Sequence, residues 1–369
     1  MPFSAPGDVV KVECKGKNDY ELCKIVKILE PSPDRVEPKC PHFGLCGGCT
    51  FQHIKREKEL LYKLSIVKET INRIGKFNID IDGIITDKDS HYRNKVEYSF
   101  FRRKPSFYSV DNKPFAIKEC IIEDSLIESV RKKISDMGGV KKLILRRDAR
   151  SKVFGIIKGV RKQRDNVEKL KRAGVDVIIA PGNKWTGEDF LEYEVGDLKL
   201  IVSPFSFFQV NTGMIEKMAV VVSDFIQPEK QDIILDAFSG VGTFGLFLAR
   251  YVKKTILVES NEYAFKDSIY NKKRNFIENV NSILSPVEKF RDYRYINKVI
   301  IDPPREGIGR AFMEMIDNSN IEKMVYISCN PATLSRDMSF LKRLRPKRIM
   351  LFDLFPMTYH IETVVLLTP

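Results

Sequence analysis

The chain has 369 residues, of which 43% are hydrophobic, and it carries a formal net charge of +13 at pH 7. This length predicts about two or three domains, and the composition excludes a disordered or fibrous protein. Charged residues interrupt every apolar run well before the roughly 20 residues that a membrane-spanning helix requires, and the first residues lack a signal-peptide pattern. We therefore expect a cytoplasmic globular protein with no membrane segment.

The first half of the chain has mainly strand-like patterns. Residues 7–30 alternate apolar and polar positions, which predicts a few short strands, and prolines at 31, 33 and 38 predict a stiff linker after them. Apolar residues then recur at helical spacing over residues 54–74, as in an amphipathic helix. Residues 80–200 again favour strands, apart from a helical stretch near residues 124–137.

The basic excess is concentrated in this central region. Residues 141–172 contain 13 basic and three acidic residues, and residues 92–108 interleave aromatic rings with cations. A polyanion such as RNA is the natural partner, with the rings on an antiparallel strand that has one face in the core and one on phosphates or bases. The alternatives are a solvated charged face and an amphipathic strand whose rings belong to the core.

Strands and helices alternate in the last third of the chain, which predicts an α/β fold with a mostly parallel sheet. Ligands bind such sheets at the carboxyl ends of the strands. We expect strands at residues 232–238, 254–259, 298–302, 323–328, 349–355 and 362–367. We expect helices ending at residue 250 and spanning residues 261–275, 308–316 and 331–344.

The first two of these strands carry features of a nucleoside site. Glycines 240 and 242 follow the strand that contains Asp236, and Glu259 ends the next strand, where it can bind a ribose diol. Together they indicate an adenosyl ligand, most simply S-adenosylmethionine, whose sulfonium needs no pyrophosphate site. The alternative is a glycine turn beside a surface glutamate.

The later strands end in reactive side chains. Two prolines after Asp302 hold that carboxylate rigidly, and Cys329 lies between a strand and a helix whose amides would stabilise a thiolate. Cys329 and Glu362 then suggest a paired nucleophile and base. An inert buried cysteine is the ordinary alternative, and His360 either orients Glu362 or a phosphate or is structural.

The chain has seven cysteines, and in a cytosolic protein they are not expected to form disulfides. Cys40, Cys46 and Cys49 are separated by five and two residues, a spacing that suits a metal site. From the spacing, zinc and an iron–sulfur cluster stay equally open, with His42 as a possible ligand. The candidates for a fourth thiolate are Cys14, Cys23, Cys120 and Cys329.

Three motifs carry a family resemblance: Asp302-Pro-Pro-Arg-Glu-Gly307, Met324-Val-Tyr-Ile-Ser-Cys329-Asn-Pro-Ala-Thr333 and Phe355-Pro-Met-Thr-Tyr-His-Ile-Glu362. With them the chain resembles the RNA uracil-5-methyltransferase family, in particular its iron–sulfur members. The resemblance implies a Rossmann-like class I methyltransferase domain over residues 201–369. It also implies a β-rich RNA-binding domain with an iron–sulfur site over residues 39–200, whose helix 54–74 can pack on the catalytic domain, and a shortened TRAM-like β segment over residues 1–38.

The resemblance also implies the site residues. Cys329 would be the nucleophile and Glu362 the base. The implied cofactor-binding residues are Gln209, Phe238, Thr243, Glu259 and Asp302. The implied ligands of a [4Fe-4S] cluster are Cys40, Cys46, Cys49 and Cys120.

The expected function is S-adenosylmethionine-dependent methylation of uridine at carbon 5 in structured RNA through a covalent adduct of Cys329. A tRNA T-loop uridine is favoured slightly over one in 23S rRNA, and the enzyme is expected to be a monomer that needs no protein partner. One alternative is an amino-methyltransferase that uses Asp302-Pro-Pro, although Arg305 stands where such enzymes carry an aromatic residue. Another is a non-catalytic module that binds or folds RNA. Trapping by 5-fluorouridine RNA separates these classes, because only the cysteine mechanism leaves a stable adduct.

Overall fold

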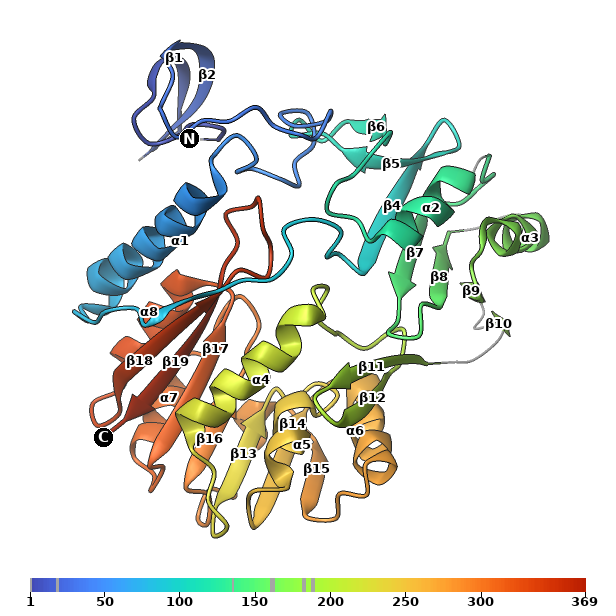
Figure 1. The fold of residues 1–369 in the computed structure, drawn as a ribbon. Helices are drawn as coiled ribbons and strands as arrows, with labels where there is room; N and C mark the ends of the chain where they lie inside the picture. The colour runs from blue at the N-terminus through green and yellow to red at the C-terminus, as the bar shows by residue number, and fades with distance from the viewer. Residues whose placement is uncertain (1, 18–19, 135, 160–162, 181–183, 187–189) are drawn as a thin grey trace.

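The computed structural model describes residues 2–17, 20–134, 136–159, 163–180, 184–186 and 190–369. Three regions follow one another along the chain (Figure 1): an N-terminal hairpin, a sheet with two helices in the middle, and a larger sheet with helices on both faces in the C-terminal part. Within the described residues, no helix combines the length and the apolar character that crossing a membrane requires.

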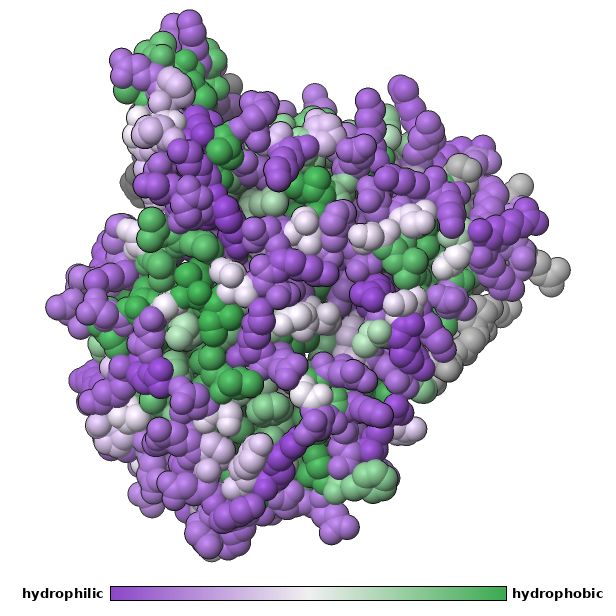
Figure 2. Space-filling view, in the orientation of Figure 1, coloured by the Kyte–Doolittle hydropathy of each residue, from purple (hydrophilic) through white to green (hydrophobic). Residues whose placement is uncertain are grey.

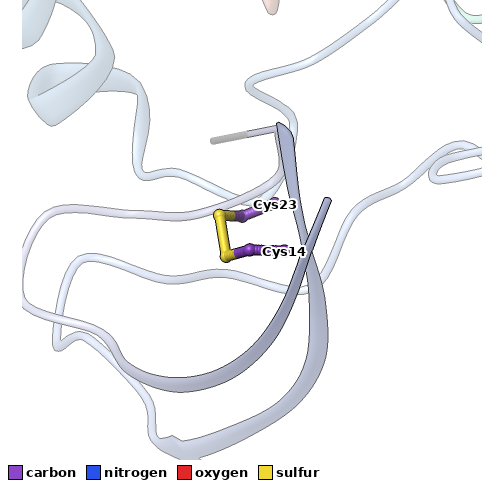
Figure 3. The surroundings of a disulfide bond; sticks show 2 residues. All are labelled: Cys14 and Cys23. Carbon is purple, nitrogen blue, oxygen red and sulfur yellow. A yellow bond between two sulfur atoms is a disulfide. The ribbon is translucent and has the colours of Figure 1, made fainter. Parts of the chain in front are cut away.

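The N-terminal region is one long hairpin instead of a few short strands. Strands β1 (Val9–Lys17) and β2 (Tyr20–Glu30) pair in antiparallel register, with Cys14 directly opposite Cys23. These two residues form a disulfide (Figure 3), so the expectation that the cysteines form no disulfide is wrong for this pair. The register explains it, because side chains at directly opposite positions of a ladder lie close together. The disulfide leaves neither residue as a thiolate for a metal site.

The middle sheet has the strand order β10-β9-β8-β7-β4-β5-β6 and is mostly antiparallel. Its strands are β4 (Lys95–Phe101), β5 (Lys104–Tyr108), β6 (Pro114–Ala116), β7 (Lys142–Arg147), β8 (Val153–Lys158), β9 (Val177–Ala180) and β10 (Lys184–Thr186). Helix α2 (Ser125–Lys133) lies where a helical stretch is expected. Helix α3 (Gln163–Ala173) lies where the sequence favours strands, because the spacing of Val167, Leu170 and Ala173 directs one helical face into the core.

The basic and aromatic segment divides between core and surface. Tyr92 and Tyr98 are buried, whereas Phe101 and Tyr108 are 38% and 50% exposed. The exposed cations between these two rings lie at the β4–β5 turn: Arg102, Arg103 and Lys104. The basic run at 141–172 extends over β7, β8 and α3, and its residues 160–162 lie outside the described part of the chain.

The C-terminal sheet has the order β15-β14-β13-β16-β17-β19-β18-β3. The first five strands in this order, β15, β14, β13, β16 and β17, are parallel, and β19 is antiparallel to both of its neighbours. Its strands are β3 (Gly83–Ile85), β13 (Ile233–Ala237), β14 (Lys254–Glu259), β15 (Val280–Leu284), β16 (Lys298–Ile301), β17 (Lys323–Ser328), β18 (Arg345–Phe352) and β19 (Glu362–Thr368). The helices that accompany it are α4 (Gly213–Ile226), α5 (Thr243–Ala249), α6 (Glu262–Arg274), α7 (Arg310–Asp317) and α8 (Pro331–Ser339), with a 3₁₀ turn at Val287–Lys289. A short separate hairpin precedes them, β11 (Leu191–Val195) with β12 (Leu198–Val202).

The last third of the chain thus has the expected α/β alternation, with two additions. Helix α4 buries Met214, Met218 and Val222 at helical spacing, and edge strand β15 has too few buried apolar residues to stand out in the sequence. Since β15 comes before β16 in the chain, Asp302 follows the fourth strand of this alternation and not the third, which the sequence predicted.

The first half of the chain also contributes to this layer. Helix α1 (Arg56–Thr70) continues into a π-helical turn at Ile71–Gly75, and its Val67 packs in one buried cluster with residues of the C-terminal sheet and of α8. Strand β3 pairs in parallel with β18 at the edge of the sheet. The C-terminal sheet is therefore completed by elements that precede the middle sheet in the sequence.

Candidate active site

A pocket of about 520 Å³ opens at the carboxyl edge of the C-terminal sheet. This is the edge at which open α/β sheets bind ligands, and the volume suits a small organic ligand. The pocket is lined by every residue expected to act in catalysis or to bind the cofactor, namely Gln209, Phe238, Thr243, Glu259, Asp302, Cys329 and Glu362.

Parallel strands bring three of these side chains together. Phe238 follows β13, Glu259 ends β14 and Asp302 follows β16, so the three lie at neighbouring strand ends. The Glu259 carboxylate accepts hydrogen bonds from the main-chain N–H of Gly240 at 2.8 Å and of Asn261 at 2.6 Å. These bonds fix the carboxylate beside the glycine turn. Gly240 has a φ of +54°, and a Cβ there would meet no atom within 4 Å, so the turn leaves space for a ligand.

Two further expected cofactor residues come from outside the strand ends. Thr243 is the first residue of α5, directly after Gly242, whose φ of +90° favours glycine. Gln209 lies in the connection between β12 and α4 and lines the pocket with Phe207 and Phe208. Phe207 is 68% exposed, so an apolar ring lies at the solvent side of the pocket.

The antiparallel pairing of β17 with β19 places Cys329 beside Glu362. Ser328 pairs with Thr363, and the next residues outward along the two strands are Cys329 and Glu362. Cys329 is half-buried with a free thiol, whereas Glu362 is 4% exposed. The side chain of Asn330 accepts a hydrogen bond from the Ala332 N–H at 3.1 Å and thereby caps α8 directly after the cysteine.

The electrostatics of this pair differ from the expectation of a thiolate stabilised by helix amides. Burial, followed by the Glu362 carboxylate, raises the pKa of the Cys329 thiol. Burial, followed by the Asp302 carboxylate, raises the pKa of Glu362 well above its usual value. Desolvation and the acidic neighbours thus dominate the titration of both groups.

Arg305 lines the pocket, and the sequence alone predicts no role for it. Its guanidinium lowers the pKa of both Cys329 and Glu362, against the larger effect of burial. The side chains of Asn330 and Thr333 donate to its main-chain oxygen at 3.2 and 3.1 Å, which holds it beside the cysteine. Its position directly after Asp302-Pro-Pro was the available signal, since the prolines stiffen this loop.

His360 is connected to the site through Arg305, which lines the pocket. Its Nδ1 is 3.5 Å from the Arg305 guanidinium, and its ring lies 4.2 Å from the ring of Tyr359. Burial, followed by the Arg305 charge, lowers the pKa of His360, which favours the neutral imidazole.

The acidic wall of the pocket suits a cationic ligand. Glu259, Asp302 and Glu362 line the pocket, and burial raises the pKa of Asp302 to about 7. A positive charge bound here would favour the ionised carboxylates. The sulfonium of S-adenosylmethionine carries such a charge, so the residues present fit this cofactor.

A second cavity, of about 250 Å³, is lined by all four expected cluster ligands, Cys40, Cys46, Cys49 and Cys120. These cysteines carry free thiols, and burial raises the pKa of Cys46, Cys49 and Cys120. His42 also lines the cavity, but its Nε2 accepts the Lys118 N–H at 3.0 Å and is thereby occupied. Among the described residues, no group of His, Cys, Asp and Glu side chains is arranged to hold a metal ion.

Comparisons with known proteins agree with the motifs. The family model of tRNA (uracil-5-)-methyltransferases matches residues 188–369. A 23S rRNA (uracil(1939)-C(5))-methyltransferase RlmD of Marinomonas sp. is 31% identical over 98% of this chain and 88% of its own length. An RNA methyltransferase of Nanoarchaeum equitans is also 31% identical, over 100% of this chain and 88% of its own.

The crystal structure of a tRNA (uracil-54, C5)-methyltransferase of Pyrococcus abyssi in complex with S-adenosyl-L-homocysteine has the same fold. It matches with a TM-score of 0.78 and 25% identity, over 100% of this chain and 95% of that chain. The identity over the full length and the position of the matched motifs around one pocket lead to one conclusion. The chain belongs to the RNA uracil-5-methyltransferase family.

Proposed function

We propose that this enzyme methylates carbon 5 of a uridine in structured RNA through a covalent adduct of Cys329, with S-adenosylmethionine as the methyl donor. A tRNA T-loop uridine is the first candidate, since the similar Pyrococcus abyssi protein is a tRNA (uracil-54, C5)-methyltransferase. A 23S rRNA uridine is the second, since the RlmD relatives are 23S rRNA (uracil(1939)-C(5))-methyltransferases. The adjacent placement of Cys329 and Glu362 at the ends of β17 and β19 is the observation that carries the proposal.

The chemistry requires a nucleophile because carbon 5 of uracil is too weakly nucleophilic to accept a methyl group unaided. Addition of the Cys329 thiolate at carbon 6 converts the ring into an enolate, whose carbon 5 is electron-rich. Arg305 favours the thiolate electrostatically. S-adenosylmethionine supplies, when bound, an electrophilic methyl group on its sulfonium.

Glu362 completes the reaction. After carbon 5 carries the new methyl group, the Glu362 carboxylate removes the proton from carbon 5, and Cys329 leaves carbon 6 as the ring double bond re-forms. The raised pKa of Glu362 suits this step, since a carboxylate with a raised pKa is a stronger base. Phe238, Thr243, Glu259 and Asp302 hold the methyl donor, and Gln209 orients the donor or the base.

The uridine has to leave its stack to reach Cys329, at a cost of a few kcal/mol. The exposed cations and rings of the β4–β5 turn, together with the exposed cations among the described residues of 141–172, would recover this cost through phosphate and stacking contacts. We propose that the enzyme acts on RNA as a cytoplasmic monomer without a protein partner.

We also propose a [4Fe-4S] cluster on Cys40, Cys46, Cys49 and Cys120. The support is that these four free thiols line one cavity, as a cluster bound by four cysteines requires. The cluster would organise the segment around it and takes no part in methyl transfer in this proposal. Removing it by chelation or oxidation should therefore weaken RNA binding along with methylation. Loss of methylation with intact RNA affinity would contradict that role.

Mapping 5-methyluridine tests the function most broadly. Total RNA from cells with and without this protein, and purified tRNA and 23S rRNA treated with the protein and S-adenosylmethionine, should differ at one uridine. A methylated T-loop uridine supports the first candidate, and a methylated 23S rRNA uridine supports the second. Methylation of an exocyclic amino group would favour an amino-methyltransferase, and RNA binding without any methylation would favour a non-catalytic module. Either result would contradict the proposal.

A further inference from the structure

We propose that a buried ionic cluster of Glu59, Lys63 and Asp353, together with Tyr92, positions the loop that delivers Glu362 to the reaction. This inference rests on the proposed function and extends it to residues outside the pocket. The loop, residues 353–361, connects β18 with β19 and rises in red from the sheet toward the N-terminal segment in Figure 1. Glu362 is the first residue of β19 and therefore comes directly after the loop.

The centre of the cluster is the Lys63 ammonium on α1. It contacts Glu59 at 2.7 Å, Asp353 at 2.6 Å and the main-chain oxygen of Phe355 at 3.3 Å. The side chains of Lys63, Glu59 and Asp353 are 1%, 2% and 0% exposed. Arg56 adds ion pairs to Glu59 and Asp353 from the same helix. A side chain from the first half of the chain thus binds two residues at the start of the loop.

The cluster also reaches the middle of the loop. Glu59 accepts the main-chain N–H of Met357 at 2.8 Å, and the main-chain N–H groups of Thr50 and Phe51 donate to the Met357 oxygen at 3.0 and 2.9 Å. Met357 has a φ of +66°, a conformation that a residue with a side chain adopts at a cost. Partners on both of its main-chain polar groups stabilise this conformation from outside the loop.

The same loop is joined to the cysteine cavity. Thr50 follows Cys49, and its hydroxyl accepts the Tyr359 N–H at 3.2 Å. The buried Tyr92 hydroxyl donates to the Pro356 oxygen at 3.2 Å. The segment that carries the cysteines therefore contributes directly to the position of the loop.

Buried ion pairs are weak evidence for stability, because desolvation offsets much of their attraction, but they fix geometry. Here the fixed geometry is that of a general base. A small displacement of Glu362 would slow proton removal from carbon 5, which comes after addition of Cys329 and after methyl transfer. The predicted consequence is specific: the methylated RNA should stay bonded to the enzyme.

The experiment uses the full-length enzyme, S-adenosylmethionine and the RNA methylated by the wild type, and it measures turnover and the covalent RNA–protein fraction. Glu362→Gln serves as the reference that accumulates the adduct. Lys63→Met should lower kcat by about tenfold to a hundredfold and accumulate adduct, with the KM for RNA little changed. Tyr92→Phe removes one hydroxyl, should leave the fold intact, and should shift both readouts in the same direction by less.

Lys298→Met is the matched control. Lys298 is also buried, and its ammonium contacts Asp232 at 2.6 Å and the main-chain oxygen of Gln227 at 2.7 Å, but it begins β16 at the edge of the sheet opposite the pocket. The Lys298→Met enzyme should be less stable than the wild type but should not accumulate adduct.

Two results overturn the inference. One is wild-type turnover in both Lys63→Met and Tyr92→Phe. The other is a loss of turnover that equals the fraction of unfolded enzyme and is not accompanied by adduct. If the proposed function itself fails, the wild type makes no 5-methyluridine and Glu362→Gln traps no RNA, which distinguishes that failure from failure of the inference alone.

Discussion

Cys329 and Glu362 lie at the ends of adjacent strands, and Arg305 in the same pocket opposes the acidic charges around them. The thiol and the carboxyl both have raised pKa values because burial disfavours their charged forms, while the guanidinium lowers both. The pH dependence of adduct formation should therefore report on Arg305, since only the thiolate adds to carbon 6.

We predict that Arg305→Gln moves the inflection of adduct formation to higher pH. Removing the cation disfavours the thiolate, so the pKa of Cys329 rises further, and the rate at neutral pH falls but recovers in alkali. Single-turnover trapping with 5-fluorouridine RNA across a pH series measures this shift. Arg310→Gln, which alters an exposed cation on α7 outside the pocket, should keep the wild-type inflection. An unchanged or lower inflection in Arg305→Gln would contradict the role assigned to Arg305.

The sequence was sufficient to predict which pocket residues lie at strand ends, but not how these residues titrate. Asp302, Cys329 and Glu362 could be placed because each follows or begins an apolar strand with a clear pattern. The helix amides after Cys329 suggested a stabilised thiolate. The net effect is the opposite because the thiol is buried and, as a smaller effect, because carboxylates from two other strands lie beside it. Both the burial and the proximity depend on a strand order that the sequence does not reveal.

Among the secondary-structure elements, the N-terminal hairpin has the least support from the rest of the molecule. Within the described residues, β1 and β2 pair only with each other. Figure 2 shows apolar side chains among charged ones on its surface, and Val9, Val12, Val26 and Leu29 are 39% to 59% exposed. An isolated two-stranded hairpin is marginally stable in water. The Cys14–Cys23 disulfide and the Asp8–Arg35 ion pair at its base, at 2.6 Å, supply the missing stability.

We predict that Cys14→Ser loosens the hairpin selectively. Loss of a disulfide that closes a short loop costs about 2–3 kcal/mol of local stability. Hydrogen exchange of the described residues in 9–30 should accelerate, while exchange in the C-terminal sheet stays as in the wild type. Reduction of the wild-type protein with dithiothreitol should reproduce the effect. Unchanged protection of the hairpin in both samples would show that the disulfide does not stabilise it.

Elements with strong periodicity were predictable, and those with weak or mixed patterns were not. Strands β13, β14, β16 and β17 have continuous apolar runs, which is typical of buried parallel strands. Helix α3 is so rich in charged residues that its three apolar positions are inconspicuous, and edge strand β15 is only partly buried. The hairpin disulfide depends on cross-strand register, which needs the turn geometry as well as the pattern.

At the scale of the whole molecule, the C-terminal layer is assembled from distant parts of the chain. The helix expected over residues 54–74 is present, but its buried face is not the purely apolar one that the spacing predicts: Leu61 is exposed, whereas Glu59 and Lys63 are buried. Apolar spacing alone does not say which surface a helix covers. Val67 and Ile71 pack with residues of α8 and of the C-terminal sheet, and β3 extends that sheet. The division into domains after residues 38 and 200 stays a proposal. Helix α1 and strand β3 come before residue 201 in the sequence but pack on and pair with the C-terminal sheet.

We predict that Val67→Ala destabilises the whole catalytic layer and not only α1. Val67 is fully buried in the shared core, and its truncation leaves a cavity that costs about 2 kcal/mol. Denaturant unfolding followed by two probes, one on α1 and one on the C-terminal sheet, should shift to the same lower midpoint. Val26→Ala, at a residue that is 59% exposed, should change stability by less than about 0.5 kcal/mol. Separate midpoints for the two probes would contradict a shared core.

The most direct test of the account is to identify the atom that bonds to RNA. The enzyme is incubated with S-adenosylmethionine and substrate RNA that carries 5-fluorouridine at the target position, and the adduct is digested and analysed by mass spectrometry. We predict a peptide containing Cys329 bonded to the methylated fluoropyrimidine nucleotide, and no adduct with Cys329→Ala despite retained RNA binding. An adduct on another cysteine, or methylated product from Cys329→Ala, would contradict the central claim.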